Sequence, residues 1–246
     1  MVDPWVIEQA LGSVIGEISD ENYEQSFAHY RFWFNLGQIY PLIPADQGLG
    51  YSSTTSDQIF NAIWSKGKAT STDPGCDKLV HPTAHLIPRF ARDIESDDLF
   101  APHNAGLQSR LCSEALRGFF RDNVKVIRYE GQNISSTVPQ GFRVHTNLVA
   151  HCANLGLVEE DAIRNRILQS LISHQKLYDH QADALVVLFK LAGATFETYA
   201  GPSVVNHCFR LLRDHGCRSP VKSDLIQVCV PLAVRAGFEP TGIFRR

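Results

Sequence analysis

The stretch Ala184-Leu-Val-Val-Leu-Phe-Lys-Leu-Ala192 decides the fold of the C-terminal half. It lies inside a predicted helix over residues 181–193, and apolar side chains occupy nearly all of its positions. A helix of this composition is apolar almost all round, so other elements must cover it on several sides. We therefore expect this helix at the buried centre of the C-terminal half.

Two amphipathic helices are expected on either side of it. Residues 159–174 place Ile163, Ile167 and Leu171 along one line at helical spacing. The other face of that helix carries charged residues, namely Glu160, Asp161, Arg164 and Arg166. Residues 202–215 begin with a proline, which the first turn of a helix tolerates, and stop before a glycine. Because the joints are short, each helix is expected to fold back antiparallel on its neighbour.

The C-terminal half also contains an internal echo. The apolar run 185–193 is repeated in residues 228–237, displaced by about 43 to 44 positions, and more faintly in residues 147–156. Over residues 141–237 the pattern resembles the armadillo and HEAT families of helical repeats. This resemblance implies a short α-solenoid of stacked antiparallel helix pairs, and a protein-binding scaffold that has no shared catalytic residues. Pro231 departs from the pattern, since a proline inside a helix bends or ends it.

The N-terminal region is expected to be helical as well. Residues 3–18 open with an aspartate cap and a proline and then show helical spacing of apolar residues. Aromatic residues follow at helical steps and predict a core stripe: Tyr23, Phe27, Tyr30 and Phe34. Residues 79–92 are expected to be helical only in part, because Pro82 and Pro88 interrupt them. Residues 107–122 predict a further helix.

The chain is therefore all-α by its pattern, with an N-terminal helical region at residues 1–130 and a helical-repeat region at residues 141–237. Residues 129–140 are rich in Gly, Ser, Thr and Pro and are the expected joint. The alternative is one continuous stack in which this joint is only a surface loop.

Composition narrows the class of protein. The 246 residues carry a formal net charge of −3, which argues against a nucleic-acid-binding surface. No apolar run approaches the roughly 20 residues that span a bilayer, and no secretion signal opens the chain, so we expect no membrane partner and an intracellular, cytoplasmic protein. The widely spaced cysteines fit a reducing compartment, where the Asn133-Ile-Ser135 triplet would not be glycosylated.

Two groups of residues could bind a metal. Cys76, His81 and His85 have atom types that zinc accepts, but a fourth ligand is not evident, so metal binding there stays open. The acidic residues Asp93, Asp97 and Asp98 resemble half of the magnesium site of an all-helical terpene synthase, with a different spacing. No complete catalytic set is present, and the sequence assigns no catalytic, cofactor-binding or metal-ligating residue.

The strongest basic series is Arg110, Arg117, Arg121, Lys125 and Arg128. It is either a solvated helix face balanced by Glu114 and Asp122 or a binding face for an acidic peptide or a nucleic-acid backbone, and the overall acidity of the chain favours the peptide.

We expect a non-enzymatic scaffold that binds another protein through stacked helices. It would bind this partner, or a second copy of itself, through the apolar helix at residues 224–236. The alternative is an all-helical enzyme with a metal-dependent or hydrolytic site between Asp93 and His103.

Overall fold

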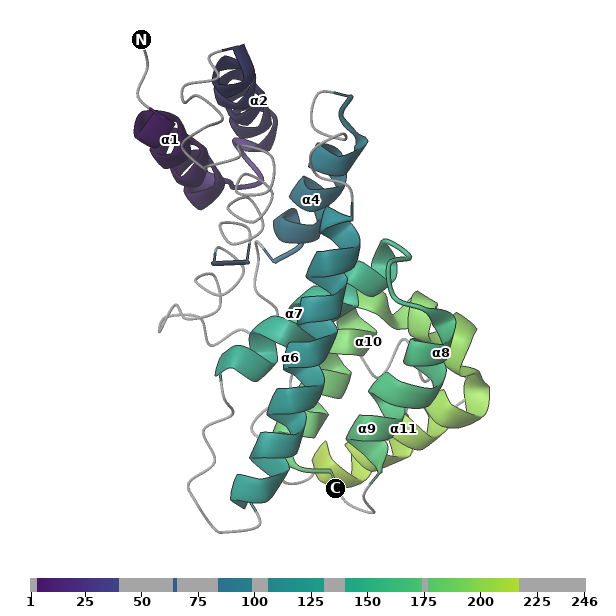
Figure 1. Ribbon diagram of the computed structural model, residues 1–246. Coiled ribbons are helices and arrows are strands. Elements are labelled where there is room, and N and C mark those ends of the chain that lie inside the picture. Colours follow the sequence, from purple (N-terminus) through teal and green to yellow (C-terminus); the bar gives the residue numbers. More distant parts are fainter. Residues whose placement is uncertain are drawn as a thin grey trace. The chain divides into compact units, whose positions relative to one another are not determined.

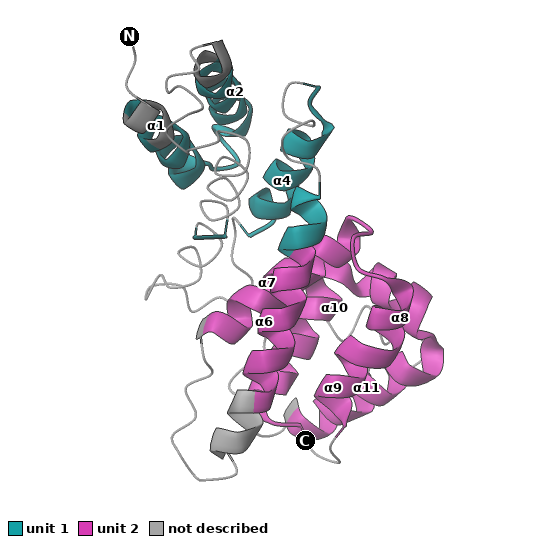
Figure 2. Cartoon of the chain, viewed as in Figure 1, with its two compact units in different colours: residues 1–73, 81–111 teal, residues 74–80, 112–246 magenta. Residues whose placement is uncertain are grey.

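The computed structural model describes residues 4–39, 64–65, 84–98, 106–130, 140–173 and 177–216. Within these ranges every regular element is a helix and none is a strand, which confirms the all-α class (Figure 1). The chain forms two compact units, residues 1–73 with 81–111 and residues 74–80 with 112–246 (Figure 2). The division falls inside α6 (Leu107–Glu130), whereas most of the expected joint at residues 129–140 lies outside the described residues.

The first two helices of unit 1 are α1 (Pro4–Glu17) and α2 (Tyr23–Ile39), which pack against each other. Proline opens α1 because a first-turn residue needs no hydrogen-bond donor. Asn22 fixes the turn between the helices. Its side-chain oxygen accepts a hydrogen bond from the Ser19 amide, and its side-chain nitrogen donates one to the Glu17 carbonyl. The helix predicted over residues 3–18 is confirmed.

Helix α4 (Leu86–Ser96) runs parallel to α2. His85 pairs with Asp20 at 2.7 Å, Arg89 with Glu24 at 2.7 Å, and both links join residues 65 positions apart. Further along, Arg31 lies 3.6 Å from Asp97.

The predicted aromatic stripe is part of the core of unit 1. The rings of Tyr23, Phe27 and Tyr30 meet Phe90 of α4 edge to face at 5.2 to 6.3 Å. Tyr30 and Phe90 are almost completely buried. Phe32, which lies on the same helix outside this stripe, is 60% exposed.

The expected interruption of the helix at Pro88 is wrong. Helix α4 begins only two residues earlier and continues through the proline to Ser96. A proline within the first turn removes an amide that has no partner inside the helix, so it breaks no helical hydrogen bond. The acidic stretch therefore begins on α4 itself.

Unit 2 contains the rest of α6, which packs antiparallel to α7 (Gln140–Asn154). The rings of Phe119 and Phe142 stack at 5.3 Å. Close to this pair, the imidazole of His145 lies directly against Gly118, where a Cβ atom would overlap the ring. The absence of a side chain at this glycine allows the two helices to approach closely.

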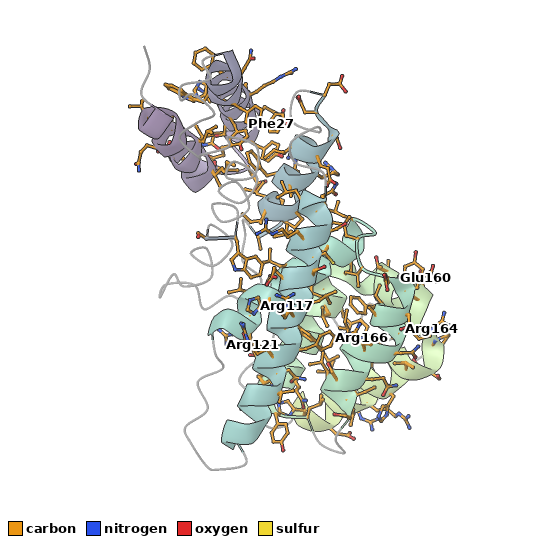
Figure 3. All side chains as sticks on the ribbon, in the orientation of Figure 1. Phe27, Arg117, Arg121, Glu160, Arg164 and Arg166 are labelled. Carbon is orange, nitrogen blue, oxygen red and sulfur yellow. The ribbon has the colours of Figure 1, made fainter. Side chains whose placement is uncertain are left out.

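The amphipathic helix predicted over residues 159–174 is interrupted. The structure forms α8 (Glu160–Ala162), a π-helical turn η2 (Ile163–Ile167) and α9 (Leu168–Ile172). The predicted apolar line is fully buried, and the charged residues of the opposite face are exposed, including Glu160, Arg164 and Arg166 in Figure 3. Local spacing therefore predicted the two faces correctly but could not reveal the wider turn.

The central helix is α10 (Asp179–Ala200), and residues 182–189 are buried without exception. Figure 1 shows α7 on one side of it and α8, α9 and α11 (Pro202–Gly216) on the other. Next to the expected end at Gly193, the helical angles are interrupted at Ala192 (φ −131°, ψ 26°), and α10 continues beyond this kink to Ala200. The turn into α11 is made by Gly201, whose φ of 78° favours glycine.

Helices of unit 2 also pair in parallel across the stack. On α7 and α10, Arg143 bonds to Asp183 and Asn154 bonds to the Leu191 carbonyl, with separations of 40 and 37 residues. On α6, the Phe120 ring lies under the Arg166 guanidinium of η2 at 5.3 Å, and Asn123 donates to the Ser170 carbonyl of α9. If α8, η2 and α9 are counted as one interrupted helix, helices separated by one intervening helix lie side by side in the same direction.

Candidate functional site

The predicted basic series places two exposed arginines on one side of α6, Arg117 and Arg121 (Figure 3). Their side chains are 71% and 56% exposed. The Arg117 guanidinium donates to Glu114 at 2.7 Å, and Arg121 Nε donates to Asp122 at 3.1 Å. We call Glu114, Arg117 and Arg121 the arginine face. The side chains of Lys125 and Arg128 lie outside the described residues, and Arg110 is an exposed residue of unit 1.

Asp122 connects the arginine face to the interior. Its side chain is only 11% exposed, and its Oδ2 atom lies 3.0 Å from Nδ1 of the buried His145. The other oxygen accepts the bond from Arg121. The carboxylate therefore links the exposed Arg121 to the buried His145.

A second polar link involves Asn123, the residue that follows Asp122 on α6. His180 Nε2 lies 3.1 Å from the side-chain oxygen of Asn123, whose amide donates to the Ser170 carbonyl. Burial lowers the pKa of His180 to about 4, so the ring is neutral at pH 7 and Nε2–H is the donor to the amide oxygen. This chain of bonds ties α6, α9 and α10 together.

A partly buried ion pair joins α7 to α10. Arg143 lies 3.4 Å from Asp183, and burial raises the pKa of this carboxyl while the guanidinium opposes the shift. Within the described part of the chain, Arg143 Nε and Asp183 Oδ1 have no hydrogen-bond partner. At the end of α11, Nε2 of His215 lies 3.1 Å from Oδ1 of Asp179.

The predicted acidic residues serve as links between helices of unit 1. Asp93 accepts a 2.7 Å hydrogen bond from the Tyr23 hydroxyl and pairs with Arg89 at 3.7 Å and with Arg92. Asp97 pairs with Arg31. Two of the three acids proposed for a magnesium site therefore bind to groups of the protein. Among the residues that the structure describes, no three His, Cys, Asp or Glu side chains converge as a metal site requires.

The other predicted metal group falls mostly outside the described residues. Cys76 and His81 are not among the described residues, and His85 pairs with Asp20 at 2.7 Å, so zinc binding by these three residues stays a prediction. Cys208 is fully buried on α11, where burial raises its pKa to about 12. A thiol in this environment stays protonated and packs as a small apolar side chain.

Comparison with protein-family models, with curated proteins and with solved structures found no match. None of the helices described is long and apolar enough to cross a bilayer.

Sequence reasoning identified the arginines but missed the histidines that support them. His145 and His180 are separated along the chain from Asp122 and Asn123, so no local motif connects them. The only signal was the occurrence of histidine within otherwise apolar helical stretches, which by itself does not identify a partner.

Proposed function

We propose that this protein is a non-enzymatic scaffold that binds another protein through a short armadillo- or HEAT-like stack of helices. The observation that carries this proposal is the parallel pairing of α7 with α10, together with that of α6 with α9. In a solenoid of helix pairs, equivalent helices of successive units lie side by side in this way.

The internal echo of the sequence supports the same arrangement. The faint repeat of residues 147–156 in residues 185–193 aligns Gly156 with Gly193, which is a shift of 37 positions. The hydrogen-bonded residues Asn154 and Leu191 are also 37 positions apart. Equivalent positions in the sequence therefore lie at the same height on two packed helices, as expected when each helix pair is one repeat.

The arginine face is the surface that we propose contacts the partner, and the partner segment is acidic. Exposed ion pairs such as Arg117 with Glu114 contribute only about 0 to 1 kcal/mol, so a carboxylate of the partner replaces Glu114 at little cost. Arg121 uses Nε for Asp122 and has no other hydrogen bond to the described residues, so its terminal amino groups are available. Two guanidinium groups one turn apart suit bidentate recognition of carboxylates.

The decisive experiment compares proteins captured from extract by three forms of the full chain. These are the wild type, the double variant Arg117→Glu/Arg121→Glu, and the control Arg213→Glu. Arg213 has the same relation to Asp214 on α11, Nε to Oδ1 at 3.1 Å, as Arg121 has to Asp122. The control thus reverses the charge at a comparable exposed arginine that lies outside the arginine face.

We expect a protein with an acidic segment to be retained by the wild type and the control and lost by the double variant. Equal retention by all three forms would show that the partner contacts another face of the scaffold. If the wild type retains nothing above an unrelated helical protein, the scaffold function is wrong.

The apolar helix predicted at residues 224–236 lies outside the described residues, so binding or self-association through it stays a prediction. Light scattering over a concentration series tests it. A strictly monomeric chain that stays soluble after deletion of residues 237–246 would contradict it.

A further inference from the structure

Arg166 is an exposed residue of unit 2 that no acidic group neutralises within the part of the chain that the structure describes. It lies on the π-helical turn η2, and its guanidinium carbon is 5.3 Å from the centre of the Phe120 ring on α6 (Figure 3). Stacking of this kind uses the flat face of the guanidinium and leaves the N–H groups in its plane available to a carboxylate. Arg166 therefore offers an anion contact next to the arginine face.

The ring under Arg166 is supported by the core of unit 2. Phe120 meets the fully buried Phe119 edge to face at 5.4 Å, and Phe120 itself is half-buried. The guanidinium thus rests on a ring whose own position is restricted by packing. Its position at the surface is more defined than that of an arginine extended into water.

Val124 is an exposed apolar residue between Arg166 and the arginine face. At about 100° per residue around the helix, it lies on α6 between Arg121 and Phe120. It follows Phe120 by four positions, so the two side chains are neighbours on the helix surface. Val124 is 48% exposed, and it is the only large hydrophobic residue that is so exposed among the described residues of unit 2.

The charges of this surface favour an acidic occupant. Arg117 is paired with Glu114 and Arg121 with Asp122, whereas Arg166 has no such partner among the described residues. Three guanidinium groups against two carboxylates leave one excess positive charge. Because exposed apolar surface adjoins this charge, the surface suits a segment that carries both acidic and apolar side chains.

The inference rests on the proposed scaffold function and names the partner segment more closely. We propose that this segment crosses α6 from the arginine face to Arg166, with a carboxylate on Arg166 and an apolar side chain on Val124 and the exposed part of Phe120. The recognised pattern is therefore an apolar side chain with acidic side chains on both sides of it. A purely acidic segment would leave the apolar surface of Val124 in water and would bind less tightly.

The test measures the binding of two synthetic peptides to the full chain by fluorescence anisotropy. In the first peptide a leucine stands between two pairs of glutamates, and in the second a serine replaces this leucine. The wild type should bind the leucine peptide about tenfold more tightly, as expected for burial of one apolar side chain. Val124→Ser should remove most of this preference while it leaves the binding of the serine peptide unchanged.

Arg166→Gln tests the acidic contact. It should weaken the binding of both peptides by about tenfold, because it removes a charged donor from a carboxylate. The control is Arg164→Gln, at an exposed arginine of the same turn η2 that is bound to the Tyr199 carbonyl at 3.0 Å. This control should bind both peptides like the wild type. Circular dichroism verifies that each variant is folded, and only folded variants are compared.

The comparison of the two peptides on the wild type needs no variant, and equal affinity for them would overturn the inference. Unchanged binding by folded Arg166→Gln would also overturn it. Binding that is lost in Arg117→Glu/Arg121→Glu but unaffected by Arg166→Gln and Val124→Ser would limit the contact to the arginine face and leave the proposed function in place. Failure of the wild type to bind either peptide overturns the inference, whereas capture from extract judges the scaffold function separately.

Discussion

The side-chain amide of Asn154 on α7 donates a hydrogen bond to the backbone carbonyl of Leu191 on α10, 37 residues further along the chain. The carbonyl is close to the kink at Ala192, where the helical φ/ψ angles are interrupted. At this point a backbone acceptor is satisfied by a side chain of the neighbouring helix. The bond links two parallel helices of unit 2 at one relative height.

Burial of α10 predicts a large effect of a charge at its centre. Leu188 is completely buried, so Leu188→Asp should lower the free energy of unfolding by roughly 4 kcal/mol or more, since it removes apolar contacts and places a carboxylate without a partner there. The measurement is denaturant unfolding followed by circular dichroism. Lys190→Asp, at an exposed position of the same helix, is the control and should change stability by less than about 1 kcal/mol. Equal stability of both variants would show that α10 is not buried.

Close packing of α6 on α7 predicts that Gly118 cannot carry a side chain. The Cβ atom in Gly118→Ala would overlap the His145 ring and should lower the free energy of unfolding by about 1 to 3 kcal/mol. Gly12→Ala is the matched control, because it adds the same atom within a helix with nothing inside 4 Å. The control should be neutral or stabilising by up to about 1 kcal/mol. If Gly118→Ala is as stable as this control, the helices do not approach as described.

The lowered pKa of His180 predicts a loss of stability in acid. The unfolded histidine binds a proton below its usual pKa of 6.5, but the folded one does so only below about 4. Between these values the unfolded state binds more protons, so stability should fall as pH decreases from 6.5 to 4, by up to about 3 kcal/mol. Asp183 contributes with the opposite sign, because its raised pKa makes the folded state hold a proton to higher pH.

His180→Gln separates the two contributions, since it removes the titrating ring and keeps a donor for Asn123. Urea unfolding at pH 7 and at pH 5 should show a smaller loss of stability in this variant than in the wild type. The contribution of Asp183 is present in both proteins and cancels in the comparison. An identical pH dependence would exclude His180 as the responsible group.

Helix positions and buried faces could be predicted from local spacing, but features set by the rest of the fold could not. Pro202 predicted the start of α11, and the line Ile163, Ile167, Leu171 is buried as expected. The passage of α10 through Gly193 was missed because packing on all sides outweighs the low helix propensity of glycine. The π-helical turn η2 was missed because an added residue in a turn leaves no mark in the residue types.

The candidate surface, too, could be predicted from the sequence only in part. The spacing of Arg117 and Arg121 placed them on one face, which the structure bears out. The bond from Asp122 to His145 depends on the packing of α6 against α7, and the sequence contains no information about which α6 residue meets which α7 residue.

The most direct test of the scaffold proposal is covalent labelling of arginines in the free chain and in its complex with the captured protein. Phenylglyoxal modification followed by peptide mapping measures Arg117, Arg121 and Arg213 in a single sample, and all three are accessible in the free chain at 71%, 56% and 43% side-chain exposure. We predict that complex formation protects Arg117 and Arg121 and leaves Arg213 as reactive as before. Unchanged labelling of Arg117 and Arg121 in the complex would contradict the proposed binding face.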